Sequence, residues 1–583
     1  MPRRPAAVVV LSLLLLAGAV LATGATEAIE LPASPSGPER YVPTESVGPA
    51  PAHRHREKDK PGTVSVAPLT GEKTQPNVVV FMTDDMRYDD LRFMPHVHRL
   101  IGDQGVTFTN TFSPQPLCCP ARASFLTGEY SHNHHVWSHV APYGFQALDD
   151  SSTLPVWLNR AGYDTQFYGK YLNGYGAQPA PDGGSSLRYV PPGWTDWQGS
   201  VDNGRSAGPA LDGGTYRYFD TTINDNGRLV PHPGVYQTRL LGDSTTEGFR
   251  EEARSPRPFF SWTSFVAPHH GGPLEADDPK PVMRSDGSVQ VFRNPARPRR
   301  VWGRFDDVLR RPPGYRGEND VSDKPFFIRD LPPLTPAEEQ GVLANARQRA
   351  ESLWLVDRQV ASMMRTLRRT GQLDDTYVVF TSDNGYFLGE HRMRQGKILP
   401  YEPSLRVPLL IRGPGIPKGQ VRTDPFTMID FAPTILDAAG VRVPRTVDGV
   451  SLLDVAKHGD RGWRRGILTE TGPRAVGDDT EESDNFLVSR HGPSPLRFSQ
   501  GVRTGDYLYV EHASRERELY DLHADPREVR NLVDEPRMRH VVRLLAHQLD
   551  LLRNCKGPVC SRPLPPSLRT RHPEVPARDG TPD

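Results

Sequence analysis

Two apolar runs in the sequence, VVVFMT and TYVVFT, are followed by paired oxygen-bearing side chains. Asp84 and Asp85 come directly after the first run, and Asp383 and Asn384 follow the second after one serine. Carboxylate and amide oxygens suit Ca²⁺ or Mg²⁺ better than Zn²⁺. A single Asp after a strand is commonly a helix N-cap. Two such pairs at separate strand ends instead favour a site for one divalent cation.

Basic side chains follow two further predicted strands. Lys170 comes after a weaker strand candidate at 162–168, and His269 comes after the apolar run at 258–266. The chain has ten lysines against sixty arginines, so a lysine at a strand end is more informative than usual. Taken alone, each residue has an alternative as a surface lysine or a loop histidine. Because ligands gather where parallel strands end, we expect both residues to converge with the acidic pairs.

The four cysteines form two close pairs with different expected roles. Cys555 and Cys560 flank a Gly-Pro turn, and in an exported protein this spacing favours a small disulfide loop. Cys118 and Cys119 are adjacent in CCPAR, where a mutual disulfide would be strained. They could be a buried pair at a helix start. A zinc site with the nearby histidines fits poorly, because paired zinc ligands are usually separated by about two to four residues.

The elements that would hold these residues alternate between strand and helix. Buried apolar strands, a short strand at 407–411 and an amphipathic helix at 344–370 predict an α/β sheet. The polar, Gly- and Pro-rich stretches 173–257 and 271–336 are interpreted as long loops that shape a substrate pocket over the carboxyl edge. After about residue 455 the pattern becomes α+β, with strands at 466–470 and 507–511 and a helix at 537–553.

The sequence predicts four regions. Residues 1–28, with two arginines before an apolar run, have the layout of a cleaved secretory signal, and an uncleaved membrane anchor is the alternative. Residues 29–75 have few bulky apolar side chains and are interpreted as a disordered linker. A catalytic domain at 76–455 and a C-terminal α+β domain at 456–583 follow. We expect a secreted or extracytoplasmic protein without stable membrane insertion.

Overall charge excludes one class of partner. Seventy basic and seventy acidic side chains leave no formal net charge. A neutral chain lacks the basic footprint of a nucleic-acid-binding protein. We therefore expect no nucleic-acid partner.

The segment CCPARASFLTG, at 118–128, resembles the signature of the type I sulfatases, C-x-P-[SA]-R followed by x-x-x-L-T-G. The resemblance extends in register over 76–455, and ELYDLHADPREVRNL resembles the family's second domain. GKYLN, HNHHV and the CKGPVC neighbourhood are most similar to N-acetylglucosamine-6-sulfatases and heparan endosulfatases. The other matching segments are VVVFMTDD, TGEYSHNHHV, FYGKYLNGYG, APHH, TSDNGYFLGEH and VPLLIRGPG.

This resemblance implies both a fold and a chemistry. The fold is an alkaline-phosphatase-like sandwich with a large mixed, mostly parallel sheet and a smaller C-terminal α+β domain. Cys118 would be oxidised to Cα-formylglycine by a formylglycine-generating enzyme during maturation. One hydroxyl of the hydrated aldehyde attacks sulfur as the alcohol leaves. The second hydroxyl then loses its proton and expels sulfate, which restores the aldehyde.

The resemblance also assigns roles to individual residues. One divalent cation, Ca²⁺ in preference to Mg²⁺, would be held by Asp84, Asp85, Asp383, Asn384 and the modified Cys118. Arg122 would hold the diol, Lys170 and Lys397 would contact the sulfate, and His269 would protonate the leaving oxygen. We further expect His134 to contact a sugar and His391 to lie near the sulfate.

One departure bears on the substrate. Many arylsulfatases have His two residues after the lysine that corresponds to Lys170, whereas this chain has Leu172, as the glucosamine-6-sulfatase branch does. We therefore expect a sulfated sugar such as 6-O-sulfated N-acetylglucosamine as substrate. The alternatives are an arylsulfatase for small esters, a phosphodiester or phosphonate hydrolase on the same fold, and a non-catalytic carbohydrate-binding protein with an unmodified Cys118.

Overall fold

The computed structural model describes residues 75–570 except 140, 203–212, 286, 316–317 and 473–497. The predicted signal segment and almost all of the predicted linker lie outside the described residues. The described residues all belong to one compact unit. In the part of the chain that the structure describes, none of the helices has the length and hydropathy that a membrane span requires.

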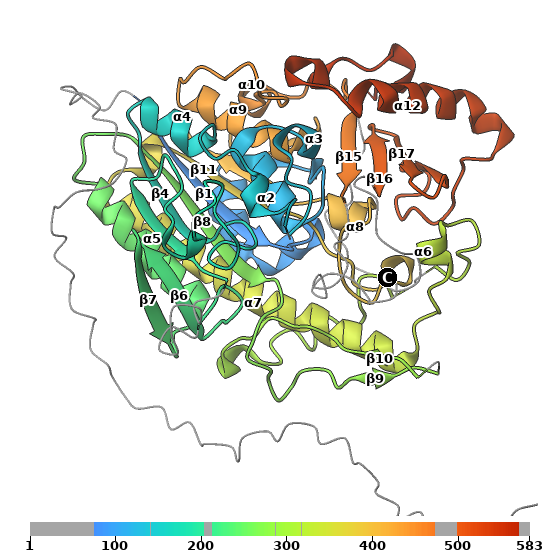
Figure 1. Ribbon diagram of the computed structural model, residues 1–583, viewed down its shortest axis with the longest axis horizontal. Helices are drawn as coiled ribbons and strands as arrows, with labels where there is room; N and C mark the ends of the chain where they lie inside the picture. Colours follow the sequence, from blue (N-terminus) through green and yellow to red (C-terminus); the bar gives the residue numbers. More distant parts are fainter. Residues whose placement is uncertain are drawn as a thin grey trace, which may run out of the picture. The chain divides into compact units, whose positions relative to one another are not determined.

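A ten-stranded mixed sheet carries the predicted strand ends (Figure 1). Its five central strands, in the order β11-β1-β8-β4-β5, are parallel, and β12 and β6 flank them as antiparallel neighbours. Asn77 of β1 pairs with Thr376 of β11, and Val78 pairs with Phe260 of β8, so these strands end at the same edge. The strands are β1 Asn77–Asp84, β2 Val106–Phe108, β4 Asp164–Lys170, β5 Asp196–Ser200, β6 Asp220–Asp225, β7 Arg228–Pro233, β8 Phe259–Pro268, β11 Thr376–Ser382, β12 Leu409–Arg412 and β13 Gln420–Arg422.

Helices cover both faces of this sheet. Alternate residues of β1 point to opposite cores, with Val78 and Val80 in one cluster and Val79 and Phe81 in the other. The first cluster lies under α2 Cys118–Thr127, α4 Leu154–Arg160 and α9 Met428–Ala438, and the second under α5 Gln237–Glu252 and α7 Pro336–Arg369. Burial on both faces explains why the central strands are continuous apolar runs rather than alternating ones.

The long helix α7 begins before the predicted start at residue 344. Pro336 occupies its first turn, and Thr335 and Glu338 form a reciprocal capping box. Both features are typical start signals of a helix. The helix therefore extends from the capping box to Arg369, close to its predicted end.

The prediction that 173–257 is a long loop is wrong. That stretch contains β5, β6, β7 and α5. The buried face of α5 is made largely of Gly and Thr, so few large apolar side chains mark it in the sequence. A Cβ on Gly242 would lie 2.4 Å from Gln359 of α7, and one on Gly248 would lie 2.1 Å from the Tyr168 hydroxyl. Small residues let this helix pack closely, which a hydrophobic pattern does not reveal.

Before α7 begins at Pro336, the described residues of 271–336 contain only short elements. These are β9 Val282–Met283, β10 Val289–Gln290, the 3₁₀ turn Arg299–Val301 and α6 Phe326–Arg329. The other short helices and strands are α1 Pro95–Val97, β3 Thr111–Phe112, α3 Ser131–His134, α8 Glu402–Leu405, β14 Phe426–Thr427 and α10 Leu453–His458.

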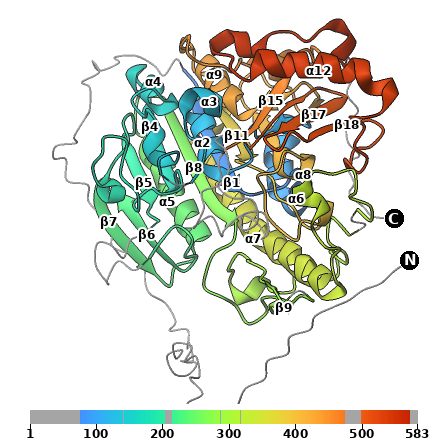
Figure 2. The same cartoon turned by 45° about the vertical axis from the view of Figure 1, so that its right-hand side comes forward.

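A four-stranded antiparallel sheet and a helix form the C-terminal region (Figure 2). The elements are β15 Ile467–Thr471, β16 Ser499–Arg503, β17 Tyr507–His512, β18 Arg517–Asp521 and α12 Arg539–Leu552. Cys555 and Cys560 are joined by a disulfide after α12, as predicted. Phe112, Tyr130 and Leu405 share a core with this sheet. The domain boundary at 455 stays a prediction.

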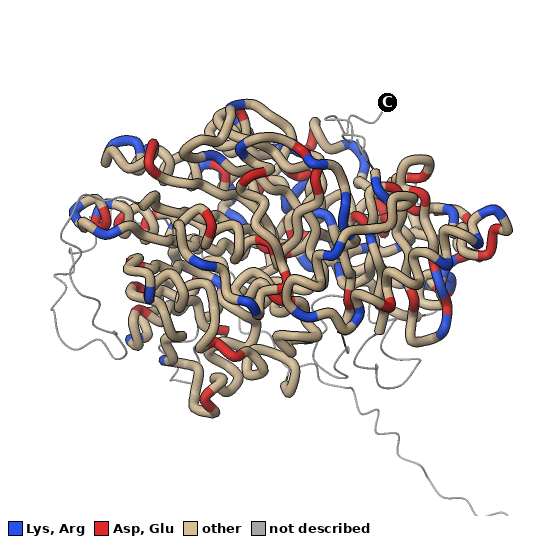
Figure 3. Tube along the Cα trace, turned by 90° about the horizontal axis from the view of Figure 1, so that it is seen from above, with Lys and Arg blue, Asp and Glu red and all other residues tan. Residues whose placement is uncertain are grey.

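Charges of both signs are interspersed along the described chain (Figure 3). No formal net charge remains over the whole sequence. This distribution is typical of a protein that does not rely on one strongly charged face.

Candidate active site

The polar strand ends meet at one edge of the large sheet. Asp84 ends β1, Lys170 ends β4, His269 follows β8 and Asp383 follows β11. Helix α2 begins there at Cys118. Ligand atoms of Asp84, Asp85, Cys118 and Asp383 lie within 4.8 Å of one another, and all four residues are buried. This is a candidate acidic metal site around a cysteine.

Cys118 lies between an acid and a lysine. Its Sγ is 3.1 Å from Asp84 Oδ1 and 2.7 Å from Lys397 Nζ. Burial, followed by the Asp84 carboxylate, raises the pKa of the Cys118 thiol well above its ordinary value, although Lys170 and Lys397 oppose the shift. A neutral thiol is a poor nucleophile. The position therefore disfavours a thiolate.

Three buried cations balance the three carboxylates. Lys170 Nζ is 2.5 Å from Asp84 Oδ2, Lys397 Nζ is 2.5 Å from Asp85 Oδ1, and Arg122 Nε is 2.8 Å from Asp383 Oδ2. Each of these six side chains is at most 1% exposed. Buried charges are tolerated when they are paired in this way.

Two buried oxygens of the site have no hydrogen-bond donor among the described residues. Asp85 Oδ2 and Asn384 Oδ1 accept no hydrogen bond in the described part of the chain. Asn384 Nδ2 instead donates to Asp85 Oδ1 at 2.7 Å, which orients both groups. Buried acceptors without donors are costly, and an oxygen-only set of this kind fits a hard divalent cation. The donor set therefore fits a Ca²⁺ or Mg²⁺ ion.

His269 presents a neutral ring to the same cluster. Its Nδ1 lies 2.8 Å from the His270 carbonyl oxygen, to which it donates, and its Nε2 lies 3.8 Å from Asp85 Oδ2. Burial, followed by Lys170 and Lys397, lowers the pKa of His269 well below its ordinary value. Proton donation by this ring requires nearby negative charge to raise that pKa, and a bound anion would supply such charge.

Several supporting residues were not predicted. Ser264 Oγ in β8 accepts a hydrogen bond from Arg122 Nη1 at 2.6 Å. Arg349 of α7 donates to the Asp85 carbonyl oxygen and, at 3.2 Å, to that of Pro268. It thereby ties the ends of β1 and β8 together. A serine inside a strand and an arginine inside a helix carry no sequence signal for these contacts.

His134 lies in a structural position. Its Nε2 is 3.0 Å from Ser124 Oγ, and its Nδ1 accepts a hydrogen bond from the Val136 backbone N–H at 3.1 Å. Burial, followed by the two neighbouring histidines, lowers the pKa of His134 to about 3. The ring is neutral, 5% exposed and engaged at both nitrogens, so the structure gives the predicted sugar contact no support and that role stays a prediction.

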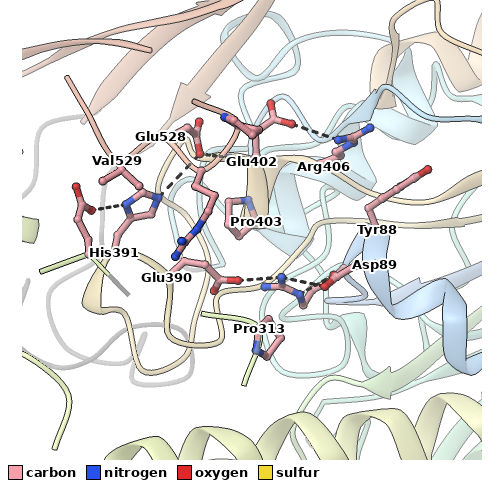
Figure 4. Close-up of a pocket in the computed structure, with 14 residues that line it drawn as sticks. Tyr88, Asp89, Pro313, Glu390, His391, Glu402, Pro403, Arg406, Glu528 and Val529 are labelled. Atoms are coloured by element: carbon pink, nitrogen blue, oxygen red, sulfur yellow. Dashed lines mark hydrogen bonds and ion pairs between the residues drawn. The ribbon is translucent and has the colours of Figure 1, made fainter. Parts of the chain in front are cut away.

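His391 lies in a separate acidic pocket (Figure 4). Its Nδ1 is 2.9 Å from Glu318 Oε2, and its ring stacks on Tyr401 with centroids 4.3 Å apart. The cavity is about 300 Å³, and its lining contains none of the residues that surround Cys118. The structure thus does not bring His391 into the Cys118 cluster. The lining residues are Arg87, Tyr88, Asp89, Pro313, Glu318, Glu390, His391, Glu402, Pro403, Arg406, Pro526, Arg527, Glu528 and Val529.

Comparison with known proteins identifies the family. The sulfatase family model matches residues 76–441, which is more than half of the chain. The chain belongs to the sulfatase family. It is therefore a sulfuric ester hydrolase, and its alkaline-phosphatase-like fold is the predicted one.

Relatives of this sulfatase are similar over most of their length. The chain is 32% identical to human N-acetylglucosamine-6-sulfatase, over 86% of this chain and 89% of that protein. It is also 32% identical to an arylsulfatase of Volvox carteri, over 86% of this chain and 77% of that protein. A protein solved in complex with its substrate D-glucosamine-2-N,6-O-disulfate has the same fold, with a TM-score of 0.61, 23% identity, and coverage of 82% of this chain and 97% of that chain.

Proposed function

We propose that this sulfatase hydrolyses the sulfate ester of a sulfated sugar, such as 6-O-sulfated N-acetylglucosamine, with formylglycine derived from Cys118. The observation that carries the proposal is the position of Cys118. It starts helix α2 beside Asp84 and Lys397 in a buried, charge-balanced cluster. In the structure, Cys118 Sγ stands in for an oxygen of the hydrated formylglycine.

The charge of the cluster supports an anionic substrate. The carboxylates and cations of the site balance, so a divalent cation would make the site positive. Asp84, Asp85, Asp383 and Asn384 would hold that cation, together with the modified residue 118, and we propose Ca²⁺. When bound, it would act as a Lewis acid toward a sulfate oxygen.

Basic side chains of the chain would contact the sulfate, orient residue 118 and exchange the proton. Lys170 and Lys397 would contact the charge that develops on the sulfate oxygens. Arg122 is held by Asp383, Ser264 and the Lys170 carbonyl, so it would orient residue 118 from a fixed position. His269 would exchange a proton with the leaving oxygen once the bound anion has raised its pKa.

Relatives with names that specify a sugar support the substrate class. N-acetylglucosamine-6-sulfatases of human and goat match over 86% of this chain. An arylsulfatase relative matches equally well, and a phosphonate monoester hydrolase from Silicibacter pomeroyi has the same fold with a TM-score of 0.57. These two remain the competing candidates.

Secretion and maturation complete the proposal. The extracellular sulfatase SULF-1 homolog of Drosophila melanogaster is 30% identical, although the chain covers only 36% of that protein. We propose an exported enzyme that meets a formylglycine-generating enzyme before use. Detection of the protein in the culture medium, with its N-terminus sequenced, tests export and signal cleavage.

A substrate comparison tests the activity. One preparation of known formylglycine content is assayed on 6-O-sulfated N-acetylglucosamine, nitrophenyl sulfate and a phenyl phosphonate. We expect the highest kcat/KM on the sugar, because binding energy of the sugar is used at the reacting sulfur. Equal or faster turnover of nitrophenyl sulfate would remove the sugar assignment, and preference for the phosphonate would remove sulfate ester hydrolysis as the main activity.

A further inference from the structure

One tyrosine contacts two of the proposed catalytic groups at once. Lys170 Nζ lies 5.0 Å from the centre of the Tyr216 ring, and the His269 ring lies 4.9 Å from it at an interplanar angle of 35°. Tyr216 precedes β6, in the stretch that the sequence predicted as a loop. Its side chain is only partly buried.

Tyr216 is held at its backbone and at its hydroxyl. Its backbone oxygen accepts a hydrogen bond from Gly272 N at 2.9 Å, and Tyr218 N donates to the Gly272 oxygen at 2.9 Å. These bonds join its segment to the one that follows His269. At the other end, Asn173 Nδ2 donates to the Tyr216 hydroxyl at 2.6 Å. The ring is therefore tied to the segments that carry both Lys170 and His269.

Both neighbours of the ring need such a support. Lys170 has a flexible four-carbon stem, and its ammonium is attracted by every carboxylate in the cluster. An aromatic face attracts an ammonium, more strongly when the pair is removed from water, and so favours one position of that stem. The plane of the His269 ring is held by its Nδ1 contact to the His270 carbonyl, by stacking on the His270 ring and by the tilted contact with Tyr216. One aromatic ring thus contacts both an ammonium and an imidazole and can set their relative position.

We propose that Tyr216 is a positioning residue for the sulfatase reaction. Its aromatic face holds Lys170 against Asp84 and orients His269 toward the leaving oxygen, and the backbone bonds to Gly272 keep the ring in place. This inference rests on the proposed function, because it assigns Lys170 and His269 to the reacting sulfate ester. The aromatic face is required, and the hydroxyl is dispensable.

Three variants separate positioning from a structural role. Tyr216→Phe keeps the face and removes the Asn173 contact, whereas Tyr216→Leu and Tyr216→Met remove the face and keep an apolar side chain. Tyr507→Leu is the matched control, because Tyr507 is a half-buried tyrosine of the C-terminal sheet. Each is assayed on a series of aryl sulfates with increasingly poor leaving groups and on the sugar sulfate, at equal formylglycine content.

Kinetic constants and unfolding midpoints are compared across this set. We expect Tyr216→Leu and Tyr216→Met to lower kcat on the order of 10- to 100-fold, as for misplaced catalytic groups, with a KM change of no more than about threefold. The loss should grow as the leaving group becomes poorer, because a misplaced His269 matters most there. Tyr216→Phe and Tyr507→Leu should stay within about threefold of wild type.

Several results would overturn the inference. Wild-type kcat in Tyr216→Leu or Tyr216→Met would remove it, as would a loss of the same size for every leaving group, which indicates a structural role. If one of these variants fails to fold, the other carries the same expectation, and failure of both would also count against positioning. A wild-type protein that carries the aldehyde and hydrolyses no sulfate ester would instead refute the proposed function.

Discussion

Replacing Lys397 with methionine removes the cation that lies closest to residue 118. Lys397 Nζ is 2.7 Å from Cys118 Sγ and 2.5 Å from Asp85 Oδ1, and the side chain is fully buried. Methionine keeps a similar apolar stem without the charge. Loss of one preorganised donor at a developing charge costs about 10²–10³ in kcat. We expect a loss of that size for Lys397→Met.

The same change leaves Asp85 without its cation. Breaking one side of a buried ion pair costs about 3–5 kcal/mol of stability. A divalent cation on Asp85 would offset part of this cost, so the variant should be destabilised more in chelator than in Ca²⁺. Arginine should not restore activity, because its larger planar head group does not fit a gap set by contacts of 2.5 and 2.7 Å.

The assay is kcat on a sulfate ester, normalised to formylglycine content, together with thermal unfolding in Ca²⁺ and in chelator. Lys457→Met is the control, because Lys457 lies over the Tyr377 ring at 5.6 Å, among residues that do not line the site. A Lys397→Met enzyme with kcat within about threefold of wild type would refute the role given to this lysine. Equal destabilisation with and without Ca²⁺ would refute the claim that the cation shares Asp85.

Three further predictions follow from the same contacts. Asp383→Asn should lose the bound cation and most activity with the fold retained, which metal analysis of the purified variant checks against wild type. Replacing Cys555 and Cys560 with serine should cost roughly 2 kcal/mol of stability, as expected for a short loop, and leave kcat nearly unchanged; denaturant unfolding and kinetics test both parts. Burial alone would lower the pKa of His132, but the Glu470 carboxylate at 3.0 Å raises it. That stability is present below the ordinary histidine pKa and is lost as pH rises through the raised one, so His132→Gln should be more destabilising at about pH 6 than at about pH 9.

The elements that could be predicted from the sequence are those in which burial alone determines the residue pattern. Strand β1 is buried on both faces, so it reads as an unbroken apolar run, and the acids after it mark the functional edge of the sheet. Helix α5 was missed because Gly242 and Gly248 pack through close approach rather than through apolar side chains. Burial of a strand can therefore be predicted from its apolar residues, whereas close packing of a helix through glycine cannot.

The same difference separates the site residues that could be predicted from those that could not. Cys118 and Lys170 lie in motifs whose local spacing already indicates chemistry. Tyr216 and Arg349 act through contacts with residues distant in sequence, at positions 269 and 85 respectively, and no local pattern marks them. His134 is adjacent to such a motif, yet its ring nitrogens are engaged by Ser124 and Val136, which only the folded chain shows.

The central claim is that Cys118 becomes the aldehyde that attacks sulfur. Mass spectrometry of the peptide that contains Cys118 and Cys119, on enzyme assayed in parallel, measures this directly. We predict that residue 118 has lost its sulfur and gained an aldehyde, that Cys119 is an unmodified thiol, and that specific activity rises in proportion to the aldehyde fraction. Cys118→Ala should be inactive and Cys119→Ala should keep most activity. Full sulfate ester hydrolysis by enzyme whose residue 118 is an intact thiol would contradict the account.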